Sequence, residues 1–395
     1  DMDYVWHPFT QMREFTSDEN LIMERGGGNW LFDTEGRSYF DAVSSLWTNV
    51  HGHRRPELDR ALSSQIHRLA HSTLLGTGNV PSALLARKLV KLAPESLERV
   101  FFSDNGSTAA EVALKMTFQS WRHRGAEGDQ RTEFVAIADS YHGDTIGSVS
   151  AGGMDLFHSL FHPLLFKTHF VPSPNCYRCP VDQQAGSCKF QCTDKLDDIL
   201  TGRGDRISAM IVEPMIQGAG GQIIYPAEVL AIYREVTARH GVPLIVDEVA
   251  TGFGRTGRMF AVEHGNIEPD IMAVAKGLSG GYLPVAATIV NNSIYSDFLG
   301  DYAQLKTFFH GHTYTGNPLA CSVSLANLEL LEKDNLTEKV RNDSVFLREE
   351  LSKRMQDHPY RIRPALRQLP DPRLHRRSGD HRDYRGNAWR AGCGA

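Results

Sequence analysis

The stretch PLIVDEVATGFGRTG (residues 243–257) joins a short apolar run to an acidic pair and a glycine-rich turn. Similar runs recur between residues 99 and 290: Val100–Phe102, Phe134–Ile137, Ala209–Val212, Leu244–Val246, Ile271–Val274 and Val285–Val290. Amphipathic segments such as Ala109–Trp121 and Ala227–His240 lie between several of them. This alternation of strand and helix predicts an α/β fold with a large, mainly parallel sheet flanked by helices.

The segments before residue 99 show other sequence patterns. Residues 1–60 are irregular and rich in Gly, Trp and His, with a hairpin predicted from Asn29–Asp33 and Ser38–Asp41. Residues 61–98 carry apolar side chains at helical spacing and are predicted to be helical. Because ligands of parallel sheets bind beyond the carboxyl ends of the strands, the residues after each apolar run are the candidates for chemistry.

Composition restricts the classes of protein that the chain can belong to. Of 395 residues, 41% are hydrophobic and 23% charged, which excludes collagen-like, disordered and coiled-coil proteins. A net charge of -5 provides no basic field for nucleic acid. We find no apolar run of about 18 residues and no signal-peptide pattern, so we expect no membrane association. Six cysteines in this length favour a cytoplasmic location.

Two strand ends offer groups that suit an anion and a planar ring. The run at 100–102 is followed by the small polar turn SDNGST (residues 103–108) and a predicted helix from Ala109. Free backbone N–H groups at a helix start can cradle a phosphate, although a helix cap without a ligand has the same pattern. Tyr141 follows the run at 134–137, where it can stack on a ligand or lie half-buried at the surface.

Two further strand ends carry a carboxylate and an amine. Asp247 follows the run at 244–246, and a buried carboxylate needs a partner, for which Arg255 or Arg258 is the structural alternative. Lys276 lies between the run at 271–274 and a turn of small residues. Burial there would lower the pKa of its amine and prepare it to capture a carbonyl group, whereas most lysines are solvated surface charges.

Together these four features are the parts of a site for pyridoxal phosphate. The phosphate needs the cradle and the pyridine ring needs a stacking face. The ring nitrogen needs an anion to stay protonated, and the aldehyde needs an amine. The sequence therefore predicts pyridoxal 5'-phosphate as the cofactor.

The segments VDEVATGFGRTG (246–257) and AKG (275–277) resemble the signature of class III aminotransferases, which have the fold-type I scaffold. Three more segments resemble the branch that aminates 8-amino-7-oxononanoate to 7,8-diaminononanoate in biotin biosynthesis: WHPFTQM (6–12), SSLWTNVHGH (44–53) and HGHTYTGNPL (310–319). The resemblance extends from about residue 5 to residue 357. It implies a transamination in two half-reactions, with S-adenosylmethionine or lysine as the amino donor.

The resemblance also implies roles for individual residues. Lys276 would bind the cofactor and carry the proton, Asp247 would pair with the pyridinium, and Tyr141 would stack on the ring. The other cofactor-binding residues would be Gly106, Ser107, Val249 and, from the partner subunit of a homodimer, Thr313. The substrate pocket would be lined by Phe9, Leu46, Trp47, Tyr141 and Gly311.

Two pocket positions depart from the commonest form of that branch. Phe9 stands where the commonest form has an aromatic hydroxyl, and the pair Leu46-Trp47 stands where it has two tryptophans. The Leu-Trp pair resembles a Bacillus-type branch in which lysine can replace S-adenosylmethionine. The donor therefore stays open between the two molecules.

The resemblance divides the chain into four parts. Residues 1–60 would belong to a small domain and the pocket, 61–315 would form the large cofactor domain, and 316–357 would connect back to the small α/β domain. Residues 358–395 hold nine Arg, no Lys and no Glu, and lack the Gly-rich strand and carboxylate-binding Arg of relatives. This composition is typical of a coding region read out of frame, so we predict that the frame is lost near Tyr360 and the small domain is incomplete. A basic tail that binds an acidic partner is the alternative.

The cysteines at 176, 179, 188 and 192 form a C-x2-C and C-x3-C pattern that resembles a zinc knuckle. No His lies nearby and the cofactor already accounts for the catalysis, so we favour an insertion loop with free thiols and predict no metal.

Two other functions stay open besides the biotin-pathway reaction. The chain can be another class III ω-aminotransferase, acting on ornithine, 4-aminobutyrate or a polyamine. It can also be a catalytically impaired chain that binds the cofactor, because the tail lacks the expected features of the family.

Overall fold

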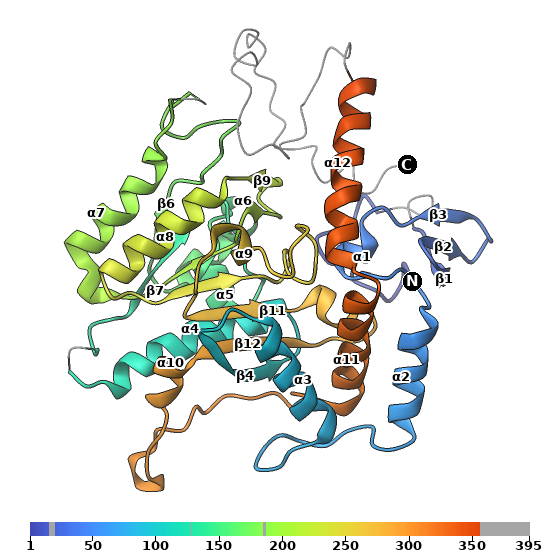
Figure 1. The fold of residues 1–395 in the computed structure, drawn as a ribbon, viewed down its shortest axis with the longest axis horizontal. Coiled ribbons are helices and arrows are strands. Elements are labelled where there is room, and N and C mark those ends of the chain that lie inside the picture. Colours follow the sequence, from blue (N-terminus) through green and yellow to red (C-terminus); the bar gives the residue numbers. More distant parts are fainter. Residues whose placement is uncertain (16–19, 127, 185–186, 356–395) are drawn as a thin grey trace.

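The structure, a computed structural model, describes residues 1–15, 20–126, 128–184 and 187–355. Its centre is a seven-stranded sheet in the order β4-β12-β11-β10-β7-β5-β6 (Figure 1). The strands are β4 Leu97–Ser103, β5 Glu133–Ile137, β6 Thr168–Val171, β7 Ile207–Val212, β10 Leu244–Asp247, β11 Ile271–Val274 and β12 Ala286–Asn291. Only β12 runs antiparallel to its neighbours, β4 and β11. The predicted mainly parallel sheet is confirmed, and all six apolar runs lie in it.

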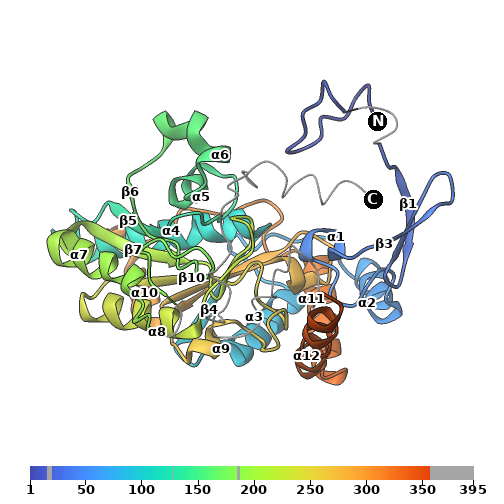
Figure 2. The same cartoon turned by 90° about the horizontal axis from the view of Figure 1, so that it is seen from above.

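The sheet separates two hydrophobic cores, because successive side chains of a strand point to opposite faces. In β7, Met210 and Val212 pack into the core that also contains α8 (Ala227–Arg239). Ala209 and Ile211 pack into the core that contains α4 (Gly106–His123). Figure 2 shows the helices on both sides of the sheet. Burial on both faces accounts for strands that are apolar throughout.

The remaining helices cover the faces and one edge of this sheet. The longer ones are α2 Pro56–Ile66, α3 Val80–Leu92, α7 Asp194–Arg203, α11 Pro318–Lys333 and α12 Leu336–Arg354. The short ones are α1 Ser44–Trp47, α5 Ile146–Ala151, α6 Asp155–His158, α9 Val262–Gly265 and α10 Asn292–Ser296. The predicted helical segments at 109–121 and 227–240 are confirmed by α4 and α8.

The prediction of a helical region from 61 to 98 is only partly right. α2 begins earlier, at Pro56, and α3 begins only at Val80, where the Asn79 side chain accepts a hydrogen bond from the backbone of Ser82. The intervening residues 67–79 are not helical, and Gly76 in this stretch has a φ of +72°. Because α2 and α3 both carry leucines at helical spacing, the sequence pattern does not reveal the break between them.

A small antiparallel sheet precedes the large one along the chain. It consists of β1 Met23–Gly27, β2 Trp30–Asp33 and β3 Ser38–Phe40, and it lies to one side of the main sheet in Figure 1. The predicted hairpin is confirmed by β2 and β3, whereas β1 was not predicted. A further two-stranded sheet pairs β8 Ile216–Gln217 with β9 Ile223–Ile224.

The first helical element, α1, is a left-handed turn. Its four residues have φ values between +47° and +69°: Ser44, Ser45, Leu46 and Trp47. The backbone N–H of Trp47 donates to the carbonyl of Val43 at 2.8 Å, and that of Thr48 donates to Ser44 at 2.9 Å. Left-handed helical geometry costs non-glycine residues about 1–2 kcal/mol each. Neighbouring groups must therefore hold this turn.

The described chain ends with α11 and α12, which stand beside the main sheet (Figure 1). Residues 358–395 and the predicted loss of frame near Tyr360 lie outside the described residues. The division into two domains stays a prediction. Within the described ranges, every helix is too short or too polar to cross a membrane.

Candidate active site

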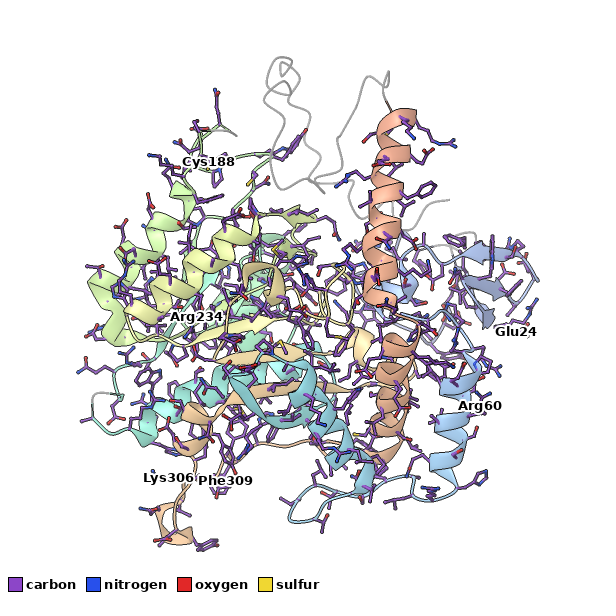
Figure 3. All side chains as sticks on the ribbon, viewed as in Figure 1. Glu24, Arg60, Cys188, Arg234, Lys306 and Phe309 are labelled. Carbon is purple, nitrogen blue, oxygen red and sulfur yellow. The ribbon has the colours of Figure 1, made fainter. Side chains whose placement is uncertain are left out.

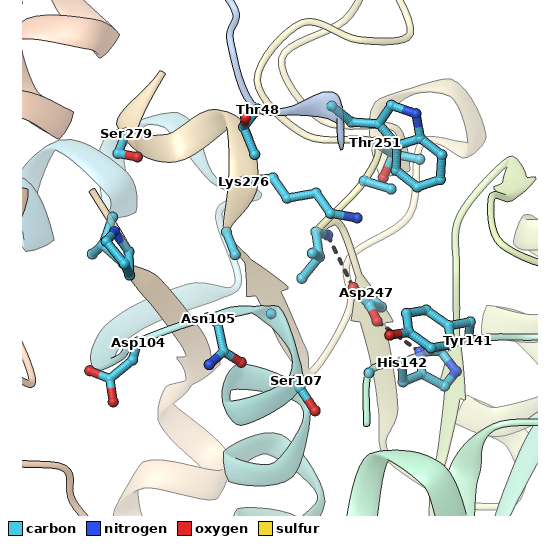
Figure 4. A pocket seen from close by; sticks show the side chains of 18 of the residues that line it. Thr48, Asp104, Asn105, Ser107, Tyr141, His142, Asp247, Thr251, Lys276 and Ser279 are labelled. Carbon is cyan, nitrogen blue, oxygen red and sulfur yellow. Dashed lines mark hydrogen bonds and ion pairs between the residues drawn. The ribbon is translucent and has the colours of Figure 1, made fainter. Parts of the chain in front are cut away.

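A cavity of about 740 Å³ lies at the carboxyl ends of the parallel strands (Figure 4). Each of five strands is followed by a residue that lines this cavity: Asn105 after β4, Tyr141 after β5, Glu213 after β7, Asp247 at the end of β10 and Lys276 after β11. Parallel strands bring these chain-distant residues to one edge of the sheet. The expected location of the site is therefore where the structure forms its cavity.

The start of α4 forms one wall of the cavity. The Asn105 side chain caps the helix by accepting a hydrogen bond from the backbone N–H of Thr108 at 3.0 Å. The N–H groups of the first helical turn have no partners within the helix and favour an anion. Gly106 packs directly on Val249, because a Cβ at Gly106 would lie 2.5 Å from Cγ1 of Val249. Ser107 Oγ is fixed by Thr145, whose hydroxyl and N–H lie 2.9 and 3.0 Å away.

Asp247 is buried in the floor of the cavity and has two defined partners. Its Oδ2 lies 2.7 Å from Nδ1 of His142, and its Oδ1 accepts a hydrogen bond from the backbone N–H of Val249 at 3.0 Å. Asp247 is 4% exposed and His142 is 3% exposed. The alternative that Arg255 pairs with this carboxylate is wrong, since Arg255 donates instead to the carbonyl oxygen of Trp47 at 3.0 Å.

Lys276 projects its amine toward Asp247 in Figure 4. It opens a short 3-10 turn, Lys276–Ser279, with a φ of +44°. Burial lowers the pKa of its amine, although the negative charges of Asp247 and Glu213 oppose this shift. The Nζ atom lies 4.4 Å from the ring centroid of Trp47. A lysine of lowered pKa carries a larger fraction of the neutral amine, which is the nucleophilic form.

Tyr141 is fixed at both ends. Its backbone N–H donates to Oε1 of Glu213 at 2.9 Å, and its hydroxyl donates to Oδ2 of Asp144 at 2.7 Å. Burial and the hydrogen bond to Asp144 raise the pKa of the Tyr141 hydroxyl. The ring lines the cavity, where its face can stack on a planar ligand.

Sequence reasoning missed two buried residues of this site, Glu213 and His142. Oε2 of Glu213 accepts a hydrogen bond from the backbone of Gly218 at 3.0 Å, and burial raises the pKa of Glu213 to about 7. Glu213 directly follows the apolar run at 209–212, so the criterion that selected Asp247 could have selected it too. His142 adjoins Tyr141 but had no signal of its own.

Four predicted residues do not line the cavity of their own chain: Phe9, Leu46, Gly311 and Thr313. Phe9 and Leu46 are each 60% exposed, and the Phe9 ring packs edge-to-face on Phe157 at 5.3 Å. Gly311 and Thr313 are exposed on the segment between α10 and α11. Figure 3 labels Lys306 and Phe309 on the same segment, which projects from the body of the chain. Their proposed roles stay predictions.

The four clustered cysteines lie between β6 and α7, and none of them lines the cavity. Figure 3 labels Cys188 on this loop. All four are free thiols, and the sulfurs of Cys179 and Cys188 each accept a backbone hydrogen bond at 3.3 Å. Within the part of the chain that the structure describes, no three His, Cys, Asp or Glu side chains are grouped to hold a metal.

The residues of the cavity fit pyridoxal phosphate. The α4 start suits the phosphate, and the close packing of Gly106 on Val249 leaves no room for a larger residue. Tyr141 offers a neutral ring, Asp247 a buried carboxylate and Lys276 an amine of lowered pKa. Each chemical group of the cofactor therefore finds the kind of partner it needs.

Comparison with known proteins identifies the family. The family model described as class-III aminotransferase matches residues 14–365. The chain belongs to this family. The fold-type I scaffold is thereby confirmed, and the chain is an aminotransferase with pyridoxal phosphate as its cofactor.

Several relatives of this aminotransferase are named adenosylmethionine-8-amino-7-oxononanoate aminotransferase. The one from Geobacter sulfurreducens is 49% identical over 352 residues, covering 89% of this chain and 77% of the relative. The crystal structure of the one from Methanocaldococcus jannaschii has a TM-score of 0.84 at 42% identity, covering 90% and 79% of the two chains. A PLP-bound amine transaminase from an uncultivated Pseudomonas species has a TM-score of 0.83 at 35% identity, covering 89% and 80%.

Proposed function

We propose that this aminotransferase transfers an amino group to the ketone of 8-amino-7-oxononanoate and so forms 7,8-diaminononanoate for biotin biosynthesis. The observation that carries the proposal is the 49% identity to the Geobacter sulfurreducens relative of that name, which covers the complete cavity. The amino donor is S-adenosylmethionine or lysine, and the Leu46-Trp47 pair is the feature that keeps lysine in consideration.

The buried residues supply the acid–base chemistry. When bound, pyridoxal phosphate stabilises negative charge at the carbon that loses its proton. Lys276 would hold the cofactor through its amine, and the same Nζ would move the proton at the reacting carbon. Asp247 would keep the ring nitrogen of the cofactor protonated, and His142, at 2.7 Å, fixes the orientation of that carboxylate.

The remaining cofactor contacts come from the cavity walls. Gly106 and Ser107 would bind the phosphate together with the N–H groups of the α4 start, and Tyr141 and Val249 would contact the ring, since all four residues line the cavity. Thr313 would complete the phosphate site from the partner subunit; in its own chain it is exposed and does not line the cavity.

We further propose that the enzyme is a homodimer in which each subunit completes the other's pocket. Large apolar side chains are exposed on the projecting segment and on the loop between α2 and α3: Tyr302, Leu305, Phe309 and Tyr314 on the segment, and Leu75 on the loop. Exposed apolar patches of this kind mark protein–protein contacts. In the dimer, Trp47 lines the acceptor pocket together with Phe9, Leu46 and Gly311.

The domain division and the location belong to the same proposal. Residues 61–315 form the cofactor domain, residues 1–60 belong to the small domain and the pocket, residues 316–357 connect into the small domain, and the native frame ends near Tyr360. Translating the other two frames of the coding DNA tests this boundary, because one of them must then encode a small-domain sequence. The five cysteines in the described ranges are free thiols, which suits the cytoplasm.

A second candidate is a broader amine transaminase. The observation that favours it is the similarity to solved ω-transaminases, including one from Thermomicrobium roseum with a TM-score of 0.83 at 32% identity. Such an enzyme would take ornithine, 4-aminobutyrate or a polyamine in place of the biotin precursor.

An acceptor assay separates the two candidates. The cofactor-loaded protein is supplied with 8-amino-7-oxononanoate and either S-adenosylmethionine or lysine, and formation of the diamine is measured by mass spectrometry. We expect turnover with one of the two donors. Turnover of ornithine or 4-aminobutyrate without any diamine would reject the biotin-pathway function. If cofactor binds but no substrate reacts, the chain is the impaired form.

A further inference from the structure

The left-handed turn of α1 lies beside the active site and has an energetically unfavourable backbone. Four consecutive non-glycine residues, Ser44 to Trp47, have left-handed backbone geometry. Single residues adopt this geometry in many loops, but a complete turn of side-chain-bearing residues is disfavoured at each position. Backbone strain of this kind persists only where surrounding groups fix it, and it concentrates at functional sites.

Asp41 is the group that fixes the turn. Its Oδ1 accepts a hydrogen bond from the backbone N–H of Ser45 at 2.9 Å. Its Oδ2 accepts one from the Ser45 hydroxyl at 2.8 Å and lies 2.9 Å from Nε2 of His53. The Asp41 side chain is 5% exposed. Both carboxylate oxygens are therefore used to hold one residue of the strained turn and one histidine behind it.

His53 connects this carboxylate to the small N-terminal sheet. Its backbone pairs with Gly28 through two hydrogen bonds of 2.7 and 3.0 Å. Its ring packs on Gly26, where a Cβ would lie 2.8 Å from Cγ of His53. The turn is thus stabilised by contacts that connect β1, His53 and Asp41. None of these residues lines the cavity.

The turn presents Trp47 to the reacting groups. Its ring centroid lies 4.4 Å from Nζ of Lys276, and the ring also packs on Gly218, where a Cβ would lie 3.0 Å from Cη2. The carbonyl of Trp47 accepts a hydrogen bond from Arg255. A right-handed or extended backbone at residues 44–47 would direct the indole elsewhere, because the φ values set the direction of the side chain.

We propose that Asp41 is a positioning residue of the active site: by locking the left-handed turn it holds the Trp47 indole across the Lys276 amine and fixes one wall of the acceptor pocket. Asp41 acts through Trp47 and touches neither cofactor nor substrate. The role of Asp41 in the acceptor pocket rests on the proposed function, whereas its role in positioning Trp47 does not.

A spectroscopic test addresses the position of Trp47 in the holoenzyme. The near-UV circular dichroism spectrum of Trp47→Phe is subtracted from that of the unaltered protein, which isolates the band of the held indole. We expect Asp41→Ala to lose this band and Asp41→Asn to retain it, because asparagine keeps an oxygen for the Ser45 N–H. If Asp41→Ala fails to fold, Ser45→Ala, which removes only the 2.8 Å bond, is expected to weaken the band.

Asp33→Ala is the matched control. The Asp33 carboxylate also holds a turn, accepting hydrogen bonds from the backbones of Glu35 at 3.0 Å and Arg37 at 2.9 Å. Its side-chain hydrogen bonds within the described residues go to Glu35, Arg37 and Tyr39 and not to α1, so its loss is expected to lower stability but leave the Trp47 band intact. An unchanged band in folded Asp41→Ala, or an unchanged band in Ser45→Ala when the former does not fold, overturns the proposal.

A kinetic cycle then tests the consequence for the acceptor. We expect Asp41→Ala to raise KM for 8-amino-7-oxononanoate more than it lowers kcat, with kcat/KM reduced about 10- to 100-fold. In a Trp47→Phe background the same change is expected to have little further effect. Equal effects in both backgrounds contradict the action through Trp47. If the acceptor is not a substrate at all, the proposed function fails while the spectroscopic result still decides the role of Asp41.

Discussion

The imidazole Nδ1 of His142 lies 2.7 Å from Oδ2 of Asp247, and both side chains are buried at the carboxyl end of the sheet. A buried carboxylate requires a partner, and His142 is the partner of one oxygen of Asp247. The other oxygen accepts a hydrogen bond from the backbone N–H of Val249. The carboxylate that is to face the cofactor ring is therefore oriented before any ligand arrives.

This contact predicts a large effect of His142→Ala on turnover. A hydrogen bond to a charged group contributes about 1.5–3 kcal/mol, so we expect kcat to fall about 10- to 100-fold. His142→Asn retains a donor and should recover part of the loss. Steady-state kinetics of both variants provide the measurement, and equal losses in the two would show that the hydrogen bond is not the reason.

Lys276→Ala should abolish both the covalent attachment of the cofactor and its proton transfer. The absorbance of the protein-bound cofactor is expected to change to that of the free aldehyde, and kcat should fall by at least about 10²–10⁴-fold. Lys167→Ala is a suitable control, since Lys167 pairs with Glu133 on β5 and does not line the cavity. If the absorbance of Lys276→Ala were unchanged, the Lys276 amine would not be the group that binds the cofactor.

Gly106→Ala should weaken cofactor binding. The added methyl group would lie 2.5 Å from Cγ1 of Val249, and such overpacking costs about 1–3 kcal/mol. Titration with pyridoxal phosphate should show a Kd raised about 5- to 100-fold. Val249→Ala in the same chain makes room and should restore affinity. Gly202→Ala, where the added atom meets nothing within 4 Å, serves as the control.

Glu248 gives the stability a defined pH dependence. The side chain is fully buried, and burial raises its pKa from 4.5 to about 7. Because the folded pKa is above the unfolded value, its contribution is fully present below pH 4.5 and is lost as the pH rises through about 7, on the order of 2–4 kcal/mol.

Glu248→Gln should reduce this loss, since glutamine can still bond Thr251 and the N–H of Val262. The difference between the melting temperatures at pH 5 and pH 8 should therefore be smaller in the variant than in the unaltered enzyme. Glu213, with a pKa also near 7, accounts for the part that remains. Identical pH profiles for the two proteins would assign the dependence to other groups.

Shared active sites predict complementation between two inactive variants. Thr313→Glu should repel the phosphate in the partner's site, and Lys276→Ala should inactivate its own site. When the two chains are co-expressed, each hybrid dimer should contain one intact site and regain activity that neither variant shows alone. Light scattering confirms that dimers form. Dimers without regained activity would place Thr313 in its own subunit's site, and full activity of Thr313→Glu alone would place it in neither site.

The strands and the strand-end chemistry could be predicted because local sequence determines both. Six of the seven strands of the main sheet contain a continuous apolar run, β6 being the exception, and the parallel order places Asp247 and Lys276 at the same edge. Glu213 follows the same rule, because it directly succeeds the apolar run at 209–212. His142, by contrast, becomes recognisable only when β5 and β10 are brought together in space.

Other features depend on contacts that no local pattern reveals. The left-handed geometry of Ser44–Trp47 contradicts the backbone preference of every residue in it and follows from Asp41 and His53. Gly311 and Thr313 do not line the cavity of their own chain, and their predicted roles depend on the proposed homodimer. The break between α2 and α3 was hidden because both helices carry leucines at helical spacing.

α12 has no buried residue among Leu336–Arg354, whereas α4 buries eight of its side chains. Tertiary packing supplies most of the stability of a helix in a protein, so the hydrogen bonds of α12 open at little free-energy cost. Hydrogen exchange and proteolysis will therefore begin at α12 within the described chain, while the sheet and its cavity remain folded. Local unfolding of α12 therefore leaves the positions of the reacting groups unchanged.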